Sequence, residues 1–409
     1  MSSKNKQLSF DNTEFAFAYK SNKELKKAHF LFKLMGKPLL VKWGLVITPL
    51  AIRYKIPFTK KVIRKTIFEQ FVGGENLEQT AKAAEKLSAY GVEVILDYGV
   101  EGGEGELAFD LACNEFIKVV DYAALQSNIP FISIKVTGVA RFGLLEKIDE
   151  LMRNNGALSL MERYEAALKI ITEDEKQEWK KVVARIEKIC AAASQKKVGV
   201  LIDAEESWIQ DPVDAITMAM MERYNPQKAI VYNTIQLYRH DRLAFLKASH
   251  EVAKNKGFVL GAKLVRGAYM EKERARAAEK GYASPIQANK EATDRDYNLA
   301  IEFCLQQYQG ISMIVASHNE YSNSYAAGLV LEKAASLPHP VNFSQLYGMS
   351  DNITFNLAKA GFAVSKYLPF GPIKDVIPYL MRRAQENSSV AGQTGRELGL
   401  IKKELQRRG

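Results

Sequence analysis

Several sequence features that identify a class of protein are rare in this chain. Its three cysteines, Cys113, Cys190 and Cys304, lie far apart in 409 residues. An odd, isolated set builds no disulfide framework and no cysteine zinc site, and it is typical of a reducing compartment. The five histidines are equally scattered, and no group of His, Asp and Glu has metal-ligand spacing. We therefore expect no metal centre.

Several motifs are also missing. Neither G-x-G-x-x-G nor G-x-x-x-x-G-K-[ST] occurs, so neither a Rossmann site nor a P-loop is indicated. No Ser-His-Asp or Cys-His arrangement suggests acyl transfer. Phosphate binding or nucleophilic catalysis, if present, must rest on other residues.

Long uncharged apolar runs are absent as well. The most apolar stretch, residues 30–56, is interrupted by Lys and Arg, so no window reaches the roughly 20 residues of a spanning helix. The first twenty residues mix lysines with Asp11 and Glu14 and resemble neither a secretory signal nor a transit peptide. We expect a bacterial, cytoplasmic protein that can lie on the inner face of the membrane. For a eukaryotic source, the mitochondrial matrix or inner membrane is expected instead.

The net charge of +10 permits contact with anionic lipid or nucleic acid. Basic residues are scattered rather than gathered into an aromatic-laced stripe, so we expect no nucleic-acid partner. Two interpretations of residues 28–66 remain open. They form either a basic amphipathic arm that rests on a membrane surface or a set of helices packed on the main domain.

The chain does contain eight short β-rich runs, which are separated by helical or polar stretches. Several are continuous apolar runs, as expected of parallel strands covered by helices. Eight such strands with crossovers predict an α/β fold, a closed (β/α)8 TIM-like barrel, rather than an open sheet. The expected strands are residues 92–97, 131–137, 198–203, 229–233, 259–265, 311–317, 341–346 and 362–368. We predict an N-terminal helical arm over residues 1–87, the barrel catalytic domain over 88–392 and a C-terminal helical tail over 393–409.

In such barrels the chemistry lies at the carboxyl ends of the strands. Polar and cationic residues occur there along almost the whole chain, and the cations outnumber the acids, so we expect anionic ligands. Gly267 and Ala268 allow close backbone approach, which suits a cofactor pyrophosphate near Arg266. His318 is open to a structural role or to ligand binding. The residues at the expected strand ends are Asp97, Glu101, Lys135, Asp203, Gln236, Lys263, Arg266, Tyr269, His318, Asn319, Leu346 and Tyr367.

Residues 366–390 combine a strand, a tight turn and a helix. A β-leaning run stops at Pro369 and Gly371, which places Tyr367 at the carboxyl end of the last strand. Helical spacing of apolar residues follows. The segment therefore predicts a helix that starts beside the barrel mouth.

On that helix, Tyr379 shares a face with Arg383, and Arg382 shares a face with Glu386. Adjacent arginines point roughly 100° apart and can hold a small carboxylate from two sides. The alternative is the solvated face of an ordinary amphipathic helix. The residues alone thus indicate a barrel enzyme that binds two anionic partners, a cofactor phosphate and a small carboxylate.

Several longer motifs are specific. They are Gly261-Ala-Lys-Leu-Val-Arg-Gly-Ala-Tyr-Met-Glu-Lys-Glu-Arg, Ala316-Ser-His-Asn and Tyr367-x-Pro-x-Gly-x7-Tyr-Leu-x-Arg-Arg-x-x-Glu-Asn, supported by Gln70-Phe-Val-x-Gly-Glu, Ile95-Leu-Asp-Tyr-Gly-Val-Glu, Ile202-Asp-Ala-Glu and Lys290-x-x-Thr-Asp. Together they resemble the FAD-dependent proline dehydrogenases, and among these the stand-alone, mitochondrial-type branch. The resemblance runs from about residue 65 to residue 390.

The resemblance implies that L-proline is oxidised to Δ1-pyrroline-5-carboxylate by hydride transfer from C5 to N5 of FAD, with a membrane quinone as the electron acceptor. It implies three groups of residues. The proline carboxylate would pair with Lys135, Arg382 and Arg383, and the ring would pack against Ala268, Tyr269, Leu346, Tyr367 and Tyr379. FAD would be held by Gln236, Lys263, Arg266, Gly267, Ala268, Thr293, His318, Asn319 and Glu386, while Asp203 would orient its neighbours and Glu101 would form a lid ion pair.

Two details bear on this resemblance. The bifunctional bacterial members carry arginine where this chain has Lys263 and lysine where it has Arg266, so the flavin contact of Lys263 is open. Tyr367 would crowd a hydroxylated ring, which favours proline over 4-hydroxyproline. The alternatives are a hydroxyproline dehydrogenase of the same family, a flavin-free barrel for a phosphorylated metabolite, and a non-catalytic membrane-surface protein.

Overall fold

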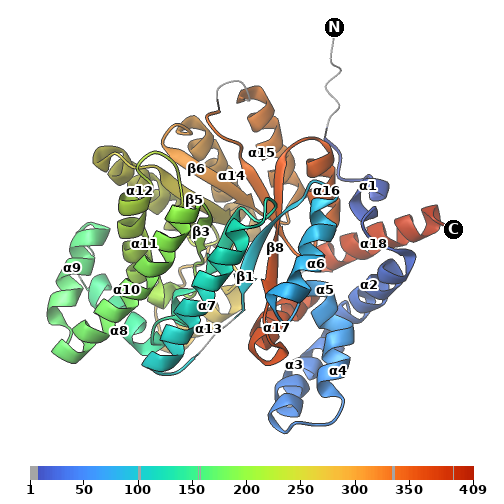
Figure 1. The fold of residues 1–409 in the computed structure, drawn as a ribbon, viewed down its shortest axis with the longest axis horizontal. Helices are drawn as coiled ribbons and strands as arrows, with labels where there is room; N and C mark the ends of the chain where they lie inside the picture. The colour runs from blue at the N-terminus through green and yellow to red at the C-terminus, as the bar shows by residue number, and fades with distance from the viewer. Residues whose placement is uncertain (1–7, 100–102, 155, 157, 334–336, 390) are drawn as a thin grey trace. The chain divides into compact units, whose positions relative to one another are not determined.

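The eight predicted strands are all present in a computed structural model that describes residues 8–99, 103–154, 156, 158–333, 337–389 and 391–409. They close into a barrel in chain order, which confirms the predicted (β/α)8 architecture (Figure 1). The strands are β1 (Glu93–Tyr98), β2 (Phe131–Ile134), β3 (Gly199–Ile202), β4 (Val231–Gln236), β5 (Leu260–Val265), β6 (Ile311–Ala316), β7 (Asn342–Leu346) and β8 (Ala363–Phe370).

Helices follow the strands along the chain and precede the first one. The N-terminal helices are α1 (Thr13–Phe17), α2 (Asn22–Met35), α3 (Pro38–Arg53), α4 (Thr59–Ile63), α5 (Glu69–Phe71) and α6 (Leu77–Ser88). The later ones are α7 (Glu106–Ala124), α8 (Phe142–Arg153), α9 (Leu160–Ile170), α10 (Glu173–Lys196), α11 (Gln210–Tyr224), α12 (Arg242–Lys256), α13 (Met270–Lys280), α14 (Lys290–Gln306), α15 (Glu320–Lys333), α16 (Asp351–Lys359), α17 (Ile373–Ser389) and α18 (Ala391–Arg407). Short turns of other helix types lie at η1 (Arg64–Phe68), η2 (Val136–Gly138) and η3 (Ser207–Ile209).

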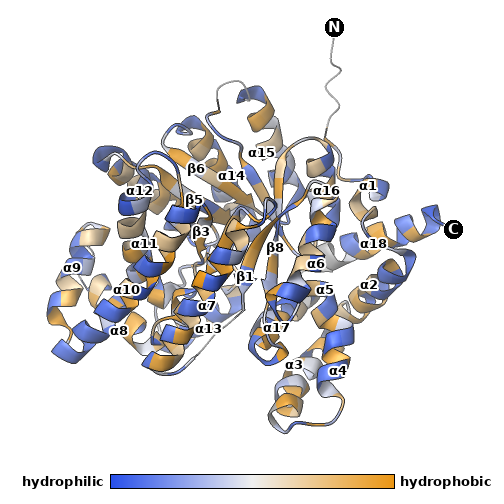
Figure 2. Ribbon diagram, in the orientation of Figure 1, coloured by the Kyte–Doolittle hydropathy of each residue, from blue (hydrophilic) through white to orange (hydrophobic). Residues whose placement is uncertain are grey.

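Local sequence explains where several helices begin. Capping boxes open α2, α9 and α10, where Ser21, Ser159 and Thr172 each exchange hydrogen bonds with a glutamate three residues later. Pro38 occupies the first turn of α3, where its missing N–H costs no hydrogen bond. Apolar residues concentrate in the strands, as Figure 2 shows, and strand interiors are buried except at Tyr367.

Three strands differ from the predicted bounds by two or more residues at one end or both, and the others by at most one residue. β2 ends at Ile134 rather than at residue 137, because Val136–Gly138 form a 3-10 turn. β4 begins two residues later than expected and ends three residues later, because the polar residues that follow its apolar start are buried and bonded. Asn233 Nδ2 donates to Asp214 (2.8 Å) and Thr234 Oγ1 to the Ile202 carbonyl (2.8 Å). β8 continues through Pro369, where the prediction stopped it, because the Pro369 carbonyl accepts a hydrogen bond from Gly73 N–H (2.8 Å).

The chain divides into two compact units. Unit 1 comprises Met1–Gly99, His318–Ser324 and Asn342–Gly409, and unit 2 comprises Val100–Ser317 and Tyr325–Val341. In unit 2, α10, α11, α12 and α14 pack against β3, β4, β5 and β6 respectively. In unit 1, the N-terminal helices share an apolar core with α17 and α18. The predicted boundaries at residues 87 and 392 stay predictions.

The helices of residues 28–66 belong to that core of unit 1. Leu31, Phe32 and Met35 of α2 and Val41 of α3 are buried, which confirms the packing interpretation for this side of the segment. Within the described ranges, no helix combines the length and the apolar character that crossing a membrane requires.

Candidate active site

An ion pair joins two strands of unit 2. Lys263 of β5 pairs with Asp203, which directly follows β3, and the pair spans β4, where Thr234 is the register partner of Lys263. Lys263 is 5% exposed. The Asp203 backbone N–H donates to the Ile134 carbonyl of β2 (2.9 Å), which fixes the carboxylate's loop. The structure thus brings two predicted site residues together, 60 residues apart in the chain.

Arg266, immediately after β5, is held on three sides. Its Nε donates to Asp294 Oδ1 (2.8 Å), its Nη1 donates to Ser317 Oγ (2.6 Å), and its guanidinium lies 4.3 Å from the Tyr297 ring centroid. Its Nη2 also pairs with Asp294 Oδ1 (2.7 Å), so these contacts fix the plane of the guanidinium. Asp294 and Ser317 were not among the predicted site residues. The signal for both was their position, next to Thr293 and His318 in the quoted motifs.

Next to these cations, buried polar atoms at the end of β4 lack partners among the described residues. Gln236 donates through Nε2 to the Glu205 carbonyl (2.9 Å), but its Oε1 has no hydrogen bond there, and neither has the Tyr238 hydroxyl. Gly267 lies against the same tyrosine at a φ of 138°, and a Cβ added to it would lie 2.4 Å from the ring. Buried polar atoms of this kind are normally satisfied, so they point to a ligand with donors and acceptors.

Unit 2 also contains a buried titratable carboxyl, Glu205, on which the charge of Lys135 acts. Lys135 follows β2 and is 8% exposed. Glu205 accepts hydrogen bonds from Thr137 Oγ1 (2.6 Å) and Thr137 N (3.3 Å). Burial raises the pKa of Glu205 to about 7, although Thr137 and Lys135 act in the opposite direction.

In unit 1, α17 carries Tyr379, Arg383 and Glu386 as one group. Arg383 is 4% exposed, its Nη2 donates to Glu386 Oε1 (2.7 Å), and its guanidinium lies 5.0 Å from the Tyr379 ring centroid. The predicted shared face of Tyr379 and Arg383 is therefore confirmed. Burial raises the pKa of Glu386 and of Tyr379.

Two donors of this group are buried without a hydrogen-bond partner in the part of the chain that the structure describes. They are the Tyr379 hydroxyl and Arg383 Nε. Arg382 lies half-buried beside them. A solvated amphipathic face would leave these groups in water, so the alternative reading of this helix as a simple charged surface is wrong for Tyr379 and Arg383. An anion or a polar ligand would complete their bonding.

Tyr367 lies in β8 between two neighbouring strands of unit 1. Its register partners are Leu346 of β7 and Ile95 of β1. The two predicted ring-packing residues, Tyr367 and Leu346, are therefore strand neighbours, and both are half-buried. They offer an apolar wall with one hydroxyl.

A sealed charge network lies under Tyr367, and no pattern in the sequence predicted it. Lys366, with 0% exposure, pairs with Asp351 Oδ1 (2.9 Å), and Asp351 also accepts from the Tyr19 hydroxyl (2.7 Å) and pairs with Lys20 (3.1 Å). Burial alone would raise the pKa of Asp351, but Lys20 and Lys366 hold it at about 2. Burial, and then Asp351, raise the pKa of Glu397 on α18 to about 7.

The remaining predicted residues vary in their surroundings. His318 Nδ1 lies 2.9 Å from Ser350 Oγ, and Asn319 Oδ1 accepts from Ser322 N–H (2.9 Å) at the start of α15. Both contacts suit structural roles, so their predicted cofactor roles stay predictions. Thr293 is buried, Tyr269 is half-buried, and Gly267 and Ala268 are exposed in the loop before α13. Glu101, the predicted lid residue, lies outside the described residues.

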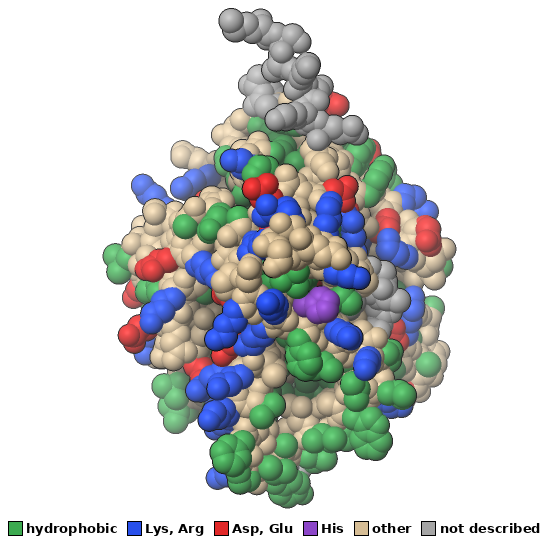
Figure 3. Space-filling model, turned by 90° about the vertical axis from the view of Figure 1, so that its right-hand side faces the viewer, with side chains coloured by type: hydrophobic (Ala, Val, Ile, Leu, Met, Phe, Trp, Pro, Cys, Tyr) green, Lys and Arg blue, Asp and Glu red, His purple; other side chains and the backbone are tan. Residues whose placement is uncertain are grey.

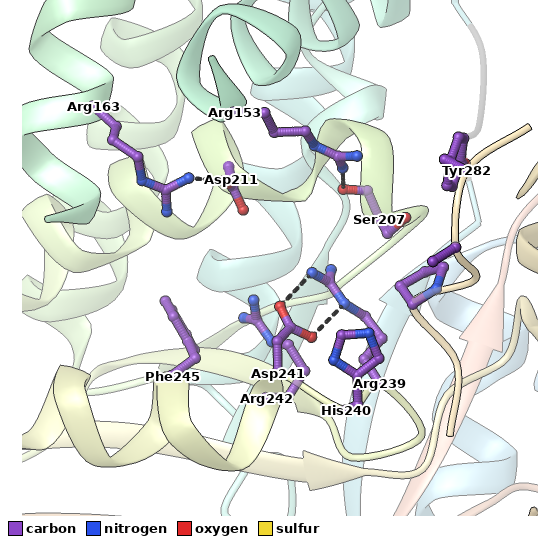
Figure 4. Close-up of a pocket in the computed structure, with 12 residues that line it drawn as sticks. Arg153, Arg163, Ser207, Asp211, Arg239, His240, Asp241, Arg242, Phe245 and Tyr282 are labelled. Atoms are coloured by element: carbon purple, nitrogen blue, oxygen red, sulfur yellow. Dashed lines mark hydrogen bonds and ion pairs between the residues drawn. The ribbon is translucent and has the colours of Figure 1, made fainter. Parts of the chain in front are cut away.

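A cavity of about 400 Å³ in unit 2 gathers arginines without any predicted site residue (Figure 4). Each of its arginines already has an acidic partner. Asp149 pairs with Arg153 (2.6 Å), Asp211 with Arg163 (2.6 Å), Asp214 with Arg242 (2.7 Å) and Asp241 with Arg239 (2.7 Å). The charges balance, so this cavity is best explained as an ion-pair network that ties α8, α9, α11 and α12 together.

Comparison with known proteins gives one family. The family model described as "Proline dehydrogenase" matches residues 80–396. The chain is 30% identical to "Proline dehydrogenase 1, mitochondrial" of Caenorhabditis elegans, over 98% of this chain and 88% of that protein. It is 32% identical to "Hydroxyproline dehydrogenase" of Xenopus laevis, over 96% of this chain and 88% of that protein.

Among solved structures, the chain resembles proline utilization A (PutA) from Bdellovibrio bacteriovorus inactivated by N-propargylglycine. The TM-score is 0.67 at 19% identity, and the match covers 95% of this chain and 40% of that one. The chain thus spans less than half of that larger protein, and the likeness supports the barrel fold.

Proposed function

Because the chain belongs to the proline dehydrogenase family, whose members are FAD-dependent flavoenzymes, we propose that it oxidises L-proline to Δ1-pyrroline-5-carboxylate. This reaction is the first step of proline catabolism. The electrons pass from the bound flavin to a quinone of the membrane.

The observation that carries the proposal is the group on α17. Arg383 is buried against Tyr379, and each has one buried donor that no described residue satisfies. A forked guanidinium matches the two oxygens of a small carboxylate. Proline supplies such a carboxylate together with an apolar ring, for which Tyr367 and Leu346 provide a wall.

The residues of unit 2 fit a flavin nucleotide. Its ring carries carbonyl and N–H groups, which match the unpartnered Gln236 Oε1 and Tyr238 hydroxyl and the ammonium of Lys263. Its pyrophosphate matches a guanidinium oriented on three sides, that of Arg266. Gly267, which leaves room where a side chain would collide with Tyr238, permits close backbone approach.

In this proposal Lys135, Arg382 and Arg383 bind the proline carboxylate and orient C5, while Tyr379, Tyr367, Leu346, Ala268 and Tyr269 surround the ring and exclude water. Asp203 holds the Lys263 ammonium in place. When bound, FAD supplies the oxidising power by accepting a hydride from C5 of proline at its N5. Thr293, His318, Asn319 and Glu386 are proposed as further contacts of the cofactor.

An absorbance spectrum of the purified protein, taken before and after anaerobic addition of L-proline, tests the proposal. Flavin bands that bleach with proline are expected. If the bands persist, the cofactor proposal stands, but L-proline is rejected as the substrate. If no bands are present even after FAD is added back, the flavin proposal is overturned.

Oxidation of 4-hydroxyproline is the second candidate. It is favoured by the relative named hydroxyproline dehydrogenase, which matches almost the whole chain. Tyr367 argues against it, because in the proposed arrangement its ring borders the pyrrolidine and would be crowded by a hydroxyl substituent. The ratio of kcat/KM for the two substrates distinguishes the candidates, and we expect a ratio well above one in favour of proline.

A further inference from the structure

One side of α3 and the segment after it expose large apolar side chains. Along α3 they are Leu39 (75% exposed), Leu40, Trp43 (66%), Val46, Ile47 and Leu50, which recur at intervals of three and four residues. Tyr54, Ile56, Phe58 and Val62 continue the exposed run into α4. We call the side chains from Leu39 to Val62 the apolar cap. Figure 3 shows hydrophobic side chains gathered at the lower end of this face, over α3 and α4.

The opposite side of α3 packs against other helices of unit 1. Val41 and Ala51 are buried, and α3 packs against α2, α4 and α17. The apolar cap is therefore not a core surface left open by a missing helix of its own bundle. It is a second apolar face on a helix whose first face is already covered. Soluble proteins rarely expose contiguous apolar surface of this kind without a partner for it.

Charge around the cap has one sign. Between Leu25 and Phe68 the sequence has eleven Lys and Arg and no Asp or Glu. This segment therefore carries a charge of +11, more than the whole chain's net charge of +10, and the rest of the chain is close to neutral. Lys33, Lys37, Lys42, Lys55, Lys60 and Lys61 lie exposed in the same segment as the cap.

We propose that the apolar cap is a docking surface for an anionic lipid bilayer. Helices that lie in the plane of an interface combine an apolar face, a cationic flank and an aromatic residue, and their binding depends on anionic lipid. Trp43 stands on the apolar face, and tryptophan prefers the boundary between headgroups and acyl chains. The helix lies on the surface rather than crossing it, because α3 has 16 residues and its other face is packed on protein.

The charge also decides between a bilayer and a second copy of the chain. Two copies that met through this surface would bring two segments of +11 together, which is unfavourable at physiological ionic strength. A surface of phosphatidylglycerol or cardiolipin has the complementary charge. The proposal rests on the exposed face and its charge, and does not depend on which substrate the active site takes.

Trp43 offers a direct probe of docking. Trp179 and Trp208 are only 3% and 6% exposed, so a change in tryptophan emission on adding vesicles reports on Trp43. We expect a blue shift with phosphatidylcholine vesicles that contain phosphatidylglycerol, and no shift with phosphatidylcholine alone. The shift should disappear in Trp43→Phe and weaken as salt is raised. If the emission is unchanged by anionic vesicles, the proposal is overturned.

Co-sedimentation with the same vesicles measures the affinity. The variant Leu40→Ser/Trp43→Ser/Ile47→Ser should bind at least about tenfold more weakly, because the apolar contact is lost. The matched control, Leu107→Ser/Leu125→Ser/Leu331→Ser, removes exposed leucines elsewhere and should bind as the wild type does. Proline oxidation with a soluble dye as acceptor should be unchanged in both, which separates loss of docking from misfolding and from failure of the proposed reaction.

Two further results would overturn the proposal. The first is equal binding by the wild type and the apolar-cap variant. The second is concentration-dependent dimerisation of the wild type in sedimentation equilibrium that the variant abolishes, which would assign the cap to a second copy of the chain.

Discussion

The two units hold their site cations in different ways. In unit 2, the partners of Lys263 and Arg266 come from distant parts of the chain, since Asp203, Asp294 and Ser317 are 60, 28 and 51 residues away. In unit 1, Arg383 takes its carboxylate from Glu386, three residues later on the same helix. The unit 2 cations are therefore fixed by tertiary contacts, whereas the unit 1 arginine takes its partner from its own helix.

This difference suits two ligands with different lifetimes. A cofactor that stays bound gains from cations oriented before it arrives, because less ordering is needed on binding. A substrate that enters and leaves in each cycle gains from a donor group carried by one helix.

Replacing Arg383 should have the largest effect. Arg383→Ala removes the buried guanidinium and leaves Glu386 without its partner, so kcat/KM for L-proline should fall by about a thousandfold, or ~4 kcal/mol. Steady-state kinetics with a soluble acceptor measures this. FAD content should be unchanged, and Lys374→Ala, which removes a cation whose side chain is 71% exposed on the same helix, should behave as the wild type. A loss below tenfold would contradict the assigned role.

The network beneath Tyr367 should matter for stability more than for chemistry. Lys366→Met leaves the buried Asp351 short of a partner and should lower the free energy of unfolding by about 3–5 kcal/mol. Urea unfolding at pH 7 measures it. The double variant Lys366→Met/Asp351→Asn should be more stable than the single variant, because no buried carboxylate is left with one of its two cations missing. If the second substitution brings no recovery, the pair is not the source of the loss.

Replacing Arg266 should weaken cofactor binding. Arg266→Ala removes a charged hydrogen-bonding group that is already oriented, so the Kd for FAD should rise by about 10- to 100-fold, or ~1.5–3 kcal/mol. Titrating the FAD-free protein and following flavin fluorescence gives the value. Arg295→Ala on α14 removes a guanidinium that is 64% exposed and should leave the Kd unchanged. Equal effects of the two substitutions would refute the contrast between the units.

Tyr367 should control the choice between two related substrates. Tyr367→Ser opens space next to Leu346, so kcat/KM for 4-hydroxyproline relative to L-proline should rise by about tenfold. Competition assays with both substrates measure the ratio. Tyr367→Phe keeps the ring and should leave the ratio close to that of the wild type. An unchanged ratio in the serine variant would remove Tyr367 from the ring-packing set.

The smallest expected effect is a pH dependence of stability. Burial raises the pKa of Glu397 from 4.5 to about 7, so the native state binds this proton more tightly than the unfolded state does. Stability is therefore lost as pH rises from about 4.5 to about 7. Glu397→Gln should lose less stability than the wild type between pH 5 and pH 8 in urea unfolding.

Glu404 on the same helix provides a control of opposite sign. Although burial acts against it, Arg407 and Arg408 hold its pKa at about 2, so its contribution is present above pH 4.5 and is lost as pH falls towards 2. Glu404→Gln should lower stability by the same amount at pH 5 and pH 8. A changed slope in this control, or an unchanged one in Glu397→Gln, would contradict the assignment.

The sequence predicted the barrel well because its signal is local. Apolar runs recur eight times, and each marks a strand. The boundaries of β4 and β8 were missed because Asn233 and Thr234 are buried only through partners on other elements, and because Pro369 remains in a strand through its carbonyl. Polarity and proline suggest a strand end unless such partners are known.

In the candidate site, too, local features could be predicted and contacts between distant residues could not. Tyr379 and Arg383 could be paired from helical spacing alone. The burial of Lys366 could not, since its network includes Tyr19, which lies 332 residues from Asp351 in the chain. A lysine in a strand next to the site is expected to reach solvent, and only the fold shows that it is enclosed.

Unit 1 is assembled from segments that are far apart in the chain, and this has a consequence during synthesis. This unit unites the first 99 residues with the last 68, and β1 pairs with β8, which a ribosome completes hundreds of residues later. Arg408, next to the last residue, donates to the carbonyls of Phe17 (2.8 Å) and Lys20 (2.7 Å). The N-terminal helices therefore leave the ribosome well before α17 and α18, and their partners in unit 1 are missing during that time. During that interval the apolar cap and the unpaired inner faces of α2 and α3 are exposed together, when the nascent chain most needs a chaperone or a nearby membrane.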